Sequence, residues 1–318
     1  MFNRILLPLD RSALAECVLP HTIAVARAFE SQVTLLHVMD TPREARWRRA
    51  MDPLNWQIRK AKAKTYLHEL DLRLQAAGLL TETHILEGFA AEQVIGFSDT
   101  HAPQLIILSS HGQSGLSDWG VSSVVQKIAL RARTSVMIVR AAQPMAPDVT
   151  GLRYQRILVP MDGTQRAESI LPAAATLARA HDAQIVLVHI VQKPSMPRRT
   201  PPSREDVELV DRLVERNQAE ATQYLDQLRS RIAGNVEARV LVSDRLAATL
   251  HELVEQEKTD LVLLSAHGRS GQTRRLYGDV VTHLIAYGTT PLVIMEDRAQ
   301  TQTAPTPIEV ANGEPGRP

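Results

Sequence analysis

Short apolar runs and stretches of helical spacing alternate at the beginning of the chain. The runs ILLPL (5–9) and VTLLHVM (33–39) are rich in Val, Ile and Leu, which is typical of strands buried on both faces. Between them, the segment from Ser12 to Phe29 repeats its apolar residues at helical spacing. The pattern therefore predicts a strand, a helix and a second strand.

The alternation continues to about residue 140. A long helix is predicted from roughly Pro53 to Ala77, with Gly78 in a C-cap role. It is followed by the strand THILEG, a short helix from Ala90, the strand QLIILS, a loop, another helix and the strand SVMIVR. Such an order predicts α/β architecture, with a parallel sheet, right-handed crossovers and helices on both faces.

The second half of the chain repeats the first. The segment that begins NRILLPLD at Asn3 matches QRILVPMD at Gln155, and the stretch 105–128 matches 261–285. SVMIVRA at Ser135 likewise matches PLVIMED at Pro291. A repeat of this length is a whole domain. We expect domains at 1–142 and 154–298, a Pro-containing linker at 143–153 and a disordered tail at 299–318.

Composition narrows the class of protein. The 318 residues are 44% hydrophobic and carry a formal net charge of +1, and aromatic residues are 4%. This balance argues against nucleic acid and anionic membranes as partners. No apolar run is long enough for a membrane span, and the first predicted strand leaves no room for a signal peptide. A single cysteine, Cys17, suits a reducing compartment, so we expect a cytoplasmic protein.

Candidate chemistry lies where the strands end. Open parallel sheets bind ligands beyond the carboxyl ends of their strands. Asp10 and Asp162 follow the first strand of each half, and a Ser-x-His-Gly turn follows the fourth strand, shortly before a helix begins. A helix N-terminus suits phosphate, and a neighbouring carboxylate suits ribose hydroxyls. A nucleotide is therefore expected, although neither a G-x-x-x-x-G-K-[ST] loop nor a G-x-G-x-x-G motif follows the first strand.

These motifs resemble the universal stress proteins, in their tandem form with two domains in one polypeptide. The resemblance covers roughly residues 2–140 and 154–297. ATP-binding members carry G-x-x-G, nine residues and then G-[ST], together with a first strand that ends in Pro-x-Asp and a second that ends in His-Val. The resemblance implies an adenine nucleotide alpha hydrolase-like fold with a five-stranded parallel sheet in each domain.

Position by position, the resemblance assigns nucleotide contacts in both halves. In the first half they are Pro8, Asp10, Val38, Ser109, His111, Gly112, Ser122 and Ser123. In the second half they are Pro160, Asp162, Ile190, Ser265, His267, Gly268, Gly278 and Asp279. Asp10 and Asp162 have an alternative role as helix caps, and Gly112 and Gly268 as plain turn glycines.

Each half departs from the family motif. Serine replaces the first glycine in both halves, and Ser122 replaces the third glycine in the first half. Ser122 can cap the helix and offer a hydroxyl to phosphate, but its side chain crowds the closest approach. The second half has Asp279 in place of a hydroxyl residue, and its repulsion of a triphosphate is on the order of 1–4 kcal/mol. Arg274 and Arg275 lie nearby in sequence to offset it. The sequence thus favours the first half for ATP and the second for a ligand with fewer phosphates.

The leading hypothesis is a stress-response protein that binds ATP, or a related adenine nucleotide, as a signal or structural ligand. It would be non-enzymatic, or at most a very slow ATPase, because Ser-x-His lacks the G-x-S-x-G elbow of a hydrolase. No metal-ligand spacing occurs, so Mg²⁺ or Mn²⁺ would arrive only with the nucleotide. His37 and His189 are predicted to be packed core histidines.

The alternative hypothesis is a scaffold with degenerate nucleotide sites that binds a protein partner, which the sequence does not identify. Domains of this family pair through their last strands. The resemblance therefore implies that SVMIVR and PLVIM meet in an intramolecular pseudo-dimer. A homo-oligomer of the whole chain is a further option.

Overall fold

The computed structural model describes residues 1–40, 53–113, 115, 121–141, 151–194, 203–268 and 277–296. Most of the predicted linker and the whole predicted tail lie outside these residues. The strands of the first half are β1 (Arg4–Pro8), β2 (Gln32–Asp40), β3 (Leu80–Gly88), β4 (Leu105–Ser109) and β5 (Ser135–Val139). Its helices are the 3₁₀ turn η1 (Ala15–Cys17), α1 (Val18–Phe29), α3 (Pro53–Ala76), α4 (Ala90–His101) and α5 (Ser123–Arg131).

The second half repeats this order. Its strands are β6 (Arg156–Pro160), β7 (Gln184–Val191), β8 (Val236–Val242), β9 (Leu261–Ser265) and β10 (Leu292–Met295). Its helices are α6 (Gln165–Glu168), α7 (Leu171–His181), α8 (Arg204–Arg231), α9 (Leu246–Gln256) and α10 (Asp279–Tyr287).

All of these strands belong to one ten-stranded sheet, in the order β3-β2-β1-β4-β5-β10-β9-β6-β7-β8. Within each half the strands are parallel, and the two halves join where β5 and β10 run antiparallel. Met137 pairs with Val293 at this junction. The two strands that the resemblance expects to meet are therefore neighbours.

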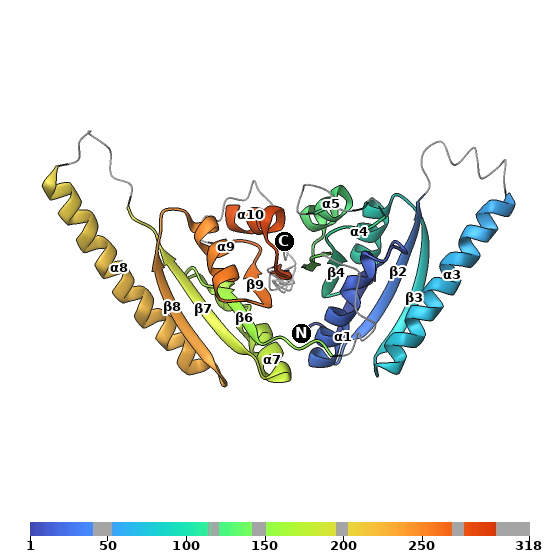
Figure 1. Ribbon diagram of the computed structural model, residues 1–318, viewed down its shortest axis with the longest axis horizontal. Helices are drawn as coiled ribbons and strands as arrows, with labels where there is room; N and C mark the ends of the chain where they lie inside the picture. The colour runs from blue at the N-terminus through green and yellow to red at the C-terminus, as the bar shows by residue number, and fades with distance from the viewer. Residues whose placement is uncertain are drawn as a thin grey trace, which may run out of the picture.

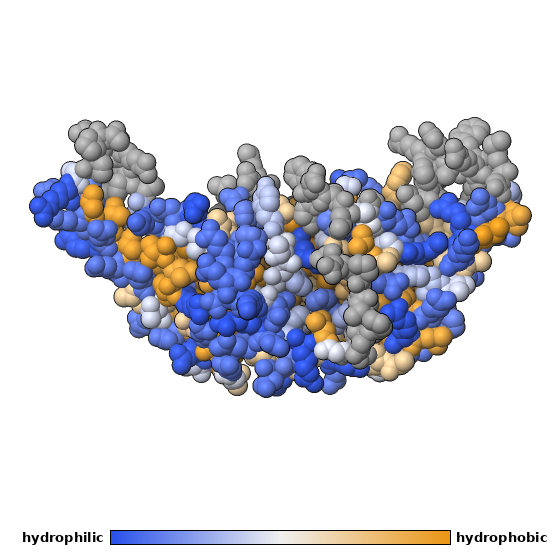
Figure 2. Space-filling model, in the orientation of Figure 1, coloured by the Kyte–Doolittle hydropathy of each residue, from blue (hydrophilic) through white to orange (hydrophobic). Residues whose placement is uncertain are grey.

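Helices cover both faces of the sheet, as the alternation predicts. On one face α1, α3, α7 and α8 enclose a core that includes Ile5, Leu35, Leu70 and Leu225. On the other face α4, α5, α9 and α10 enclose a second core. Figure 1 shows α3 and α8 at the two outer ends, with α1 beside α7 and α5 beside α10 near the middle. The surface in this view is mostly hydrophilic, with hydrophobic patches near the outer helices (Figure 2).

Two expectations about the first helices can be compared with the structure. The stretch from Ser12 begins as a turn and the 3₁₀ segment η1, and α1 starts only at Val18. The reason is local, because the Asp10 and Ser12 side chains bind backbone N–H groups of this turn. The long helix is confirmed as α3, and Gly78 just after it has a φ of +84°, which favours glycine.

Candidate functional site

Asp10 and Asp162 each build a turn just beyond the first strand of their half. The Ser12 N–H donates to Asp10 Oδ1 at 2.9 Å, and the Thr164 N–H donates to Asp162 Oδ1 at 3.0 Å. The capping oxygens belong instead to the hydroxyl residues, because the Ala15 N–H donates to Ser12 Oγ, and Thr164 Oγ1 accepts a bond at the start of α6. The aspartates are thus turn formers rather than helix caps.

The remaining carboxylate oxygen of each aspartate lies against the glycine of the Ser-x-His-Gly turn. A Cβ atom at Gly112 would stand 1.9 Å from Asp10 Oδ2, and one at Gly268 would stand 2.7 Å from Asp162 Oδ2. Neither glycine has a positive φ in the structure. These glycines are therefore needed for close approach of the turn to the carboxylate, and not for an unusual backbone conformation.

The serine of each Ser-x-His-Gly turn is bonded to the backbone. Ser109 Oγ donates to the His111 carbonyl at 2.7 Å, and Ser265 Oγ donates to the His267 carbonyl at 2.9 Å. The His111 imidazole instead lies with Nδ1 3.0 Å from the hydroxyl of Ser110. Ser109 and Ser265 are thus bonded to backbone carbonyls and not to the imidazole of their own Ser-x-His-Gly turn, as a nucleophile would be bonded to its base. The Ser110–His111 contact joins two adjacent residues that are both buried.

The helices that follow the turns begin differently in the two halves. Ser122 is the N-cap of α5, as expected, and its side chain accepts the Val125 N–H. Gly278 is the N-cap of α10 and provides no side-chain cap. Its φ is −68°, which any residue adopts, and a Cβ atom there would meet no atom of the described chain within 4 Å. The glycine therefore leaves open space in front of the first turn of α10.

Gly278 and the first residues of α10 line a cavity of about 470 Å³ in the second half. The volume suits a small-molecule ligand. Every second-half position that the resemblance assigns to nucleotide lines it, namely Pro160, Asp162, Ile190, Ser265, His267, Gly268, Gly278 and Asp279. The structure thus brings together, in one cavity, residues that are spread over more than a hundred positions of the chain.

The first-half residues are arranged more tightly. Ser109 and His111 are buried, with 9% and 7% of their surface exposed, whereas Ser265 and His267 are half-buried. The Gln113 N–H donates to Asp10 Oδ2 at 2.6 Å, and the Gln113 side chain donates to the Asp10 carbonyl. Pro8, Val38, Gly112 and Ser122 are half-buried and Ser123 is exposed. In this half the Asp10 carboxylate and the Ser109 hydroxyl, which were expected to meet a ligand, both form hydrogen bonds within the protein.

The cavity also contains a histidine predicted for another role and residues that the sequence did not single out. His189 was predicted, like His37, to be a packed core histidine, but it is half-buried and lines the cavity. His37 is buried as predicted, with Nδ1 2.7 Å from the Leu9 carbonyl. Burial lowers the pKa of His37. Leu246 and Leu250 of α9 add an apolar wall. Their helical spacing was the available signal, but it could not show that they face a ligand.

Some expectations fall outside the described residues. Arg274 and Arg275, which could offset the charge of Asp279, lie in the stretch 269–276, and much of the corresponding loop of the first half is likewise not described. Among the residues that are described, no group of three or more His, Cys, Asp or Glu side chains is placed to hold a metal ion. No helix there is long and apolar enough to cross a membrane.

Fold and site together define an α/β protein built from two copies of one domain, with a ligand-sized cavity at the strand ends of the second copy. Residues 1–140 and 153–296 both match the model of the universal stress protein family, so the chain belongs to that family.

Individual relatives are similar at low sequence identity. A universal stress protein of Methanocaldococcus jannaschii is 23% identical over 146 residues, which is 44% of this chain and 83% of that protein. A universal stress protein of Mycobacterium tuberculosis is 23% identical over 197 residues, which is 60% of this chain and 61% of that protein.

Solved structures support the fold over nearly the whole length. The crystal structure of a universal stress protein from Archaeoglobus fulgidus has a TM-score of 0.64 and 16% identity, and covers 93% of this chain and 99% of its own. A putative universal stress protein from Pseudomonas aeruginosa has a TM-score of 0.67 and 13% identity, and covers 93% of each chain. At these identities the likeness concerns the fold alone.

Proposed function

We propose that this tandem universal stress protein binds an adenine nucleotide in the cavity of its second half, as a signal or structural ligand. The observation that carries the proposal is the cavity itself, because it gathers every second-half residue of the nucleotide motif and has the volume of a small-molecule site. The geometry thereby favours the second half, whereas the sequence favoured the first.

The residues present fit such a ligand. Val188, Ile190 and Leu250 form an apolar part of the wall, which suits a purine base. The Asp162 carboxylate stands at the mouth of the sheet, where a ribose hydroxyl could donate to it. The first turn of α10 would receive the phosphates, because helix N-termini attract anions and Gly278 leaves them room.

We further propose that the nucleotide is bound without turnover, or with very slow hydrolysis. The Ser265 hydroxyl donates to a backbone carbonyl, so it is not held as a nucleophile next to the His267 imidazole. Mg²⁺ or Mn²⁺ would enter with the phosphates. We also propose a cytoplasmic location, which suits a sequence with a single cysteine.

The test is a calorimetric titration with ATP of the wild-type chain and of Gly278→Phe. The backbone at Gly278 accepts any residue, a Cβ atom there meets no described atom within 4 Å, and Gly278 lines the cavity, so we expect a phenylalanine side chain to occupy ligand space without straining the backbone. We expect ATP affinity to fall by at least tenfold, with an unchanged melting temperature. Ser122→Phe is the matched control, because it alters the equivalent helix start of the first half and should leave the second site intact.

Each result has a separate meaning. If Gly278→Phe binds ATP like the wild type and Ser122→Phe does not, the working site is in the first half. If the wild-type chain gives neither heat nor a thermal shift with millimolar ATP, the nucleotide proposal is wrong. The partner-binding scaffold would then be the better description of the protein.

A further inference from the structure

A second cavity lies where the two halves meet. It has a volume of about 1080 Å³, and its walls come from the ends of α4, α5, β5 and β10. His267 lines this groove and also lines the nucleotide cavity. The junction groove, as we call this cavity, therefore adjoins the site of the second half although most of its wall belongs to the first half.

Arginine side chains of the first half give the groove a cationic wall. Arg131 is the last residue of α5, and Arg133 follows two positions later; both are exposed and line the groove. Neither has an ion pair in the part of the chain that the structure describes. At the same place in the second half, α10 ends at Tyr287 and Thr289 follows, so this pair of charges belongs to one half only.

Arg4 adds a third guanidinium, and it lacks one of the acidic partners that its counterpart in the second half has. Its counterpart Arg156 forms ion pairs with Glu237 and Glu257. In the first half the position of Glu257 is occupied by His101, and the Arg4 guanidinium donates to the Ala102 carbonyl at 3.0 Å. The Arg4 guanidinium therefore lines the groove with a carbonyl as its partner, where Arg156 has two carboxylates.

Acidic groups line the same groove and have to be counted. Asp99 lies on α4, and Glu296 follows β10. With histidine counted as neutral, the lining residues comprise three arginines and these two carboxylates, which gives a formal net charge of +1. The groove is thus cationic by one charge, with its positive groups on Arg4, Arg131 and Arg133.

A cross-domain contact fixes the arginine wall relative to the nucleotide cavity. The hydroxyl of the buried Tyr277 donates to the carbonyl of Ala129, which lies two residues before the end of α5. Tyr277 directly precedes Gly278, which lines the nucleotide cavity. The helix end that carries Arg131 is therefore tied to the start of α10.

We infer that the junction groove receives the outer phosphates of the nucleotide bound in the second half, and that Arg131 and Arg133 of the first half bind them. This inference rests on the proposed function. It explains how a site with Asp279 at its helix start could hold a triphosphate, because the arginines supply the cationic charge beyond that carboxylate. One nucleotide would then contact both halves of the chain.

The experiment compares adenosine, AMP and ATP in calorimetric titrations of the full chain and of the double variant Arg131→Gln with Arg133→Gln. Two exposed charge contacts are lost, so we expect ATP affinity to fall roughly tenfold, while adenosine affinity stays unchanged. The wild-type preference for ATP over AMP should also decline as salt rises. The double variant Arg131→Lys with Arg133→Lys should restore much of the ATP affinity.

A control variant removes the same charge elsewhere. Arg212→Gln with Arg229→Gln alters exposed arginines of α8, far along the chain from the groove, and should bind all three ligands like the wild type. Equal ATP affinity in the wild type and in the Arg131/Arg133 variant would overturn this inference and leave the nucleotide site standing. Failure of the wild type to bind any of the three ligands would instead overturn the proposed function.

Discussion

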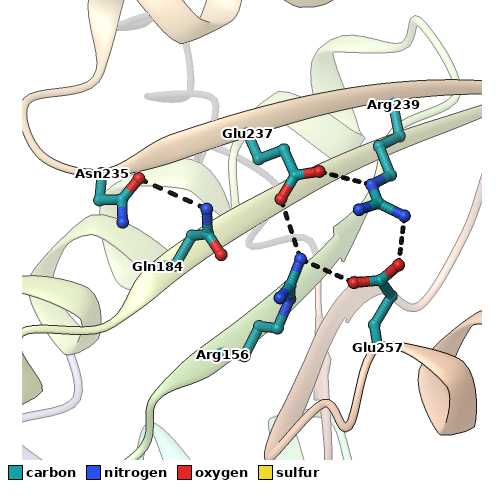
Figure 3. Close-up of polar contacts among 6 residues, drawn as sticks. All are labelled: Arg156, Gln184, Asn235, Glu237, Arg239 and Glu257. Carbon is teal, nitrogen blue, oxygen red and sulfur yellow. Dashed lines mark hydrogen bonds and ion pairs between the residues drawn. The ribbon is translucent and has the colours of Figure 1, made fainter.

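The amino-terminal ends of the strands differ between the two halves more than the shared fold suggests. In the second half Arg156, Glu237, Arg239 and Glu257 form a closed ring of alternating charges (Figure 3). Arg156 Nη2 lies 2.9 Å from Glu237 Oε2 and 2.7 Å from Glu257 Oε2, and the Arg239 guanidinium forms ion pairs with the same two carboxylates. Hydrogen bonding to Glu237 raises the pKa of Arg239.

The first half fills the equivalent positions with other groups. Glu82 and Glu237 occupy the same register of their strands, but His84 and His101 stand where the second half has Arg239 and Glu257. His101 stacks on Phe97 with ring centroids 3.8 Å apart, and Glu82 accepts a hydrogen bond from Thr34 at 2.6 Å. The same backbone arrangement therefore accommodates a ring of ion pairs in the second half and a group of aromatic side chains in the first half. In the first half Arg4 lines the junction groove instead of joining such a ring.

The largest expected effect comes from opening the ring with Glu257→Gln. Only 14% of the Glu257 side chain is exposed, and its loss leaves Arg156 and Arg239 together with a single carboxylate. We expect the free energy of unfolding to fall by about 3 kcal/mol, at the lower end of the range for breaking a buried pair, because the arginine partners are partly exposed. Urea denaturation would measure it. The control His101→Gln changes an exposed side chain of the first half and should cost less than about 1 kcal/mol; equal losses would show that the ring contributes no special stability.

The comparison also shows what the sequence could establish. Strand and helix order, the repeat and the cap at Ser122 depend on local patterns, so they could be predicted from residues close in sequence. The ion ring brings Arg156 next to Glu257, and the cavity brings Asp162 and Gly278 into one site. These residues are far apart in the sequence, and the pattern of apolar and polar positions does not show how the segments that carry them pack together. The closer packing of the first-half site depends on Gln113, a residue with no motif role. For this reason the sequence could name the candidate residues of both halves, but it favoured the half that the geometry favours less.

A second difference between the halves concerns the facing helices α1 and α7. The first half has His21 on α1, and the second half has no histidine at the matching position of α7. His21 Nδ1 is 2.8 Å from the Tyr154 hydroxyl, and the second half has Ala173 at the matching position. Burial lowers the pKa of His21 from 6.5 to about 4. The unfolded chain therefore takes up a proton near pH 6.5 that the folded chain resists until about pH 4, so stability falls as the pH falls through this window.

His21→Gln tests this pH dependence. Glutamine keeps an acceptor for the Tyr154 hydroxyl but cannot be protonated, so the loss of unfolding free energy between pH 7 and pH 4.5 should shrink by about 2 kcal/mol. Burial also lowers the pKa of His37 and His181, which leaves part of the dependence in place. Urea denaturation at a series of pH values measures the change. His68→Gln, on the exposed side of α3, should leave the profile unaltered, and an unaltered profile in His21→Gln would contradict the assignment.

The smallest expected effect concerns the first residue of the two site helices, which is Ser123 in α5 and Asp279 in α10. Asp279→Ser removes a carboxylate from the wall of the cavity, so we expect ATP to bind about tenfold more tightly, equivalent to about 1.4 kcal/mol. Adenosine, which has no phosphate, should bind as before. The helix also loses an acidic group at its N-terminus, at a cost of about 0.5 kcal/mol in stability.

Ser123→Asp is the matched exchange in the first half. If the nucleotide occupies the second half, this variant should leave ATP affinity unchanged, because its new charge lies at the other site. Calorimetry of both variants with ATP and adenosine therefore separates the halves without blocking either one. Weaker ATP binding in Ser123→Asp, with no gain in Asp279→Ser, would place the ligand in the more tightly packed half and would mean that the Asp10–Gln113 contact opens to admit it.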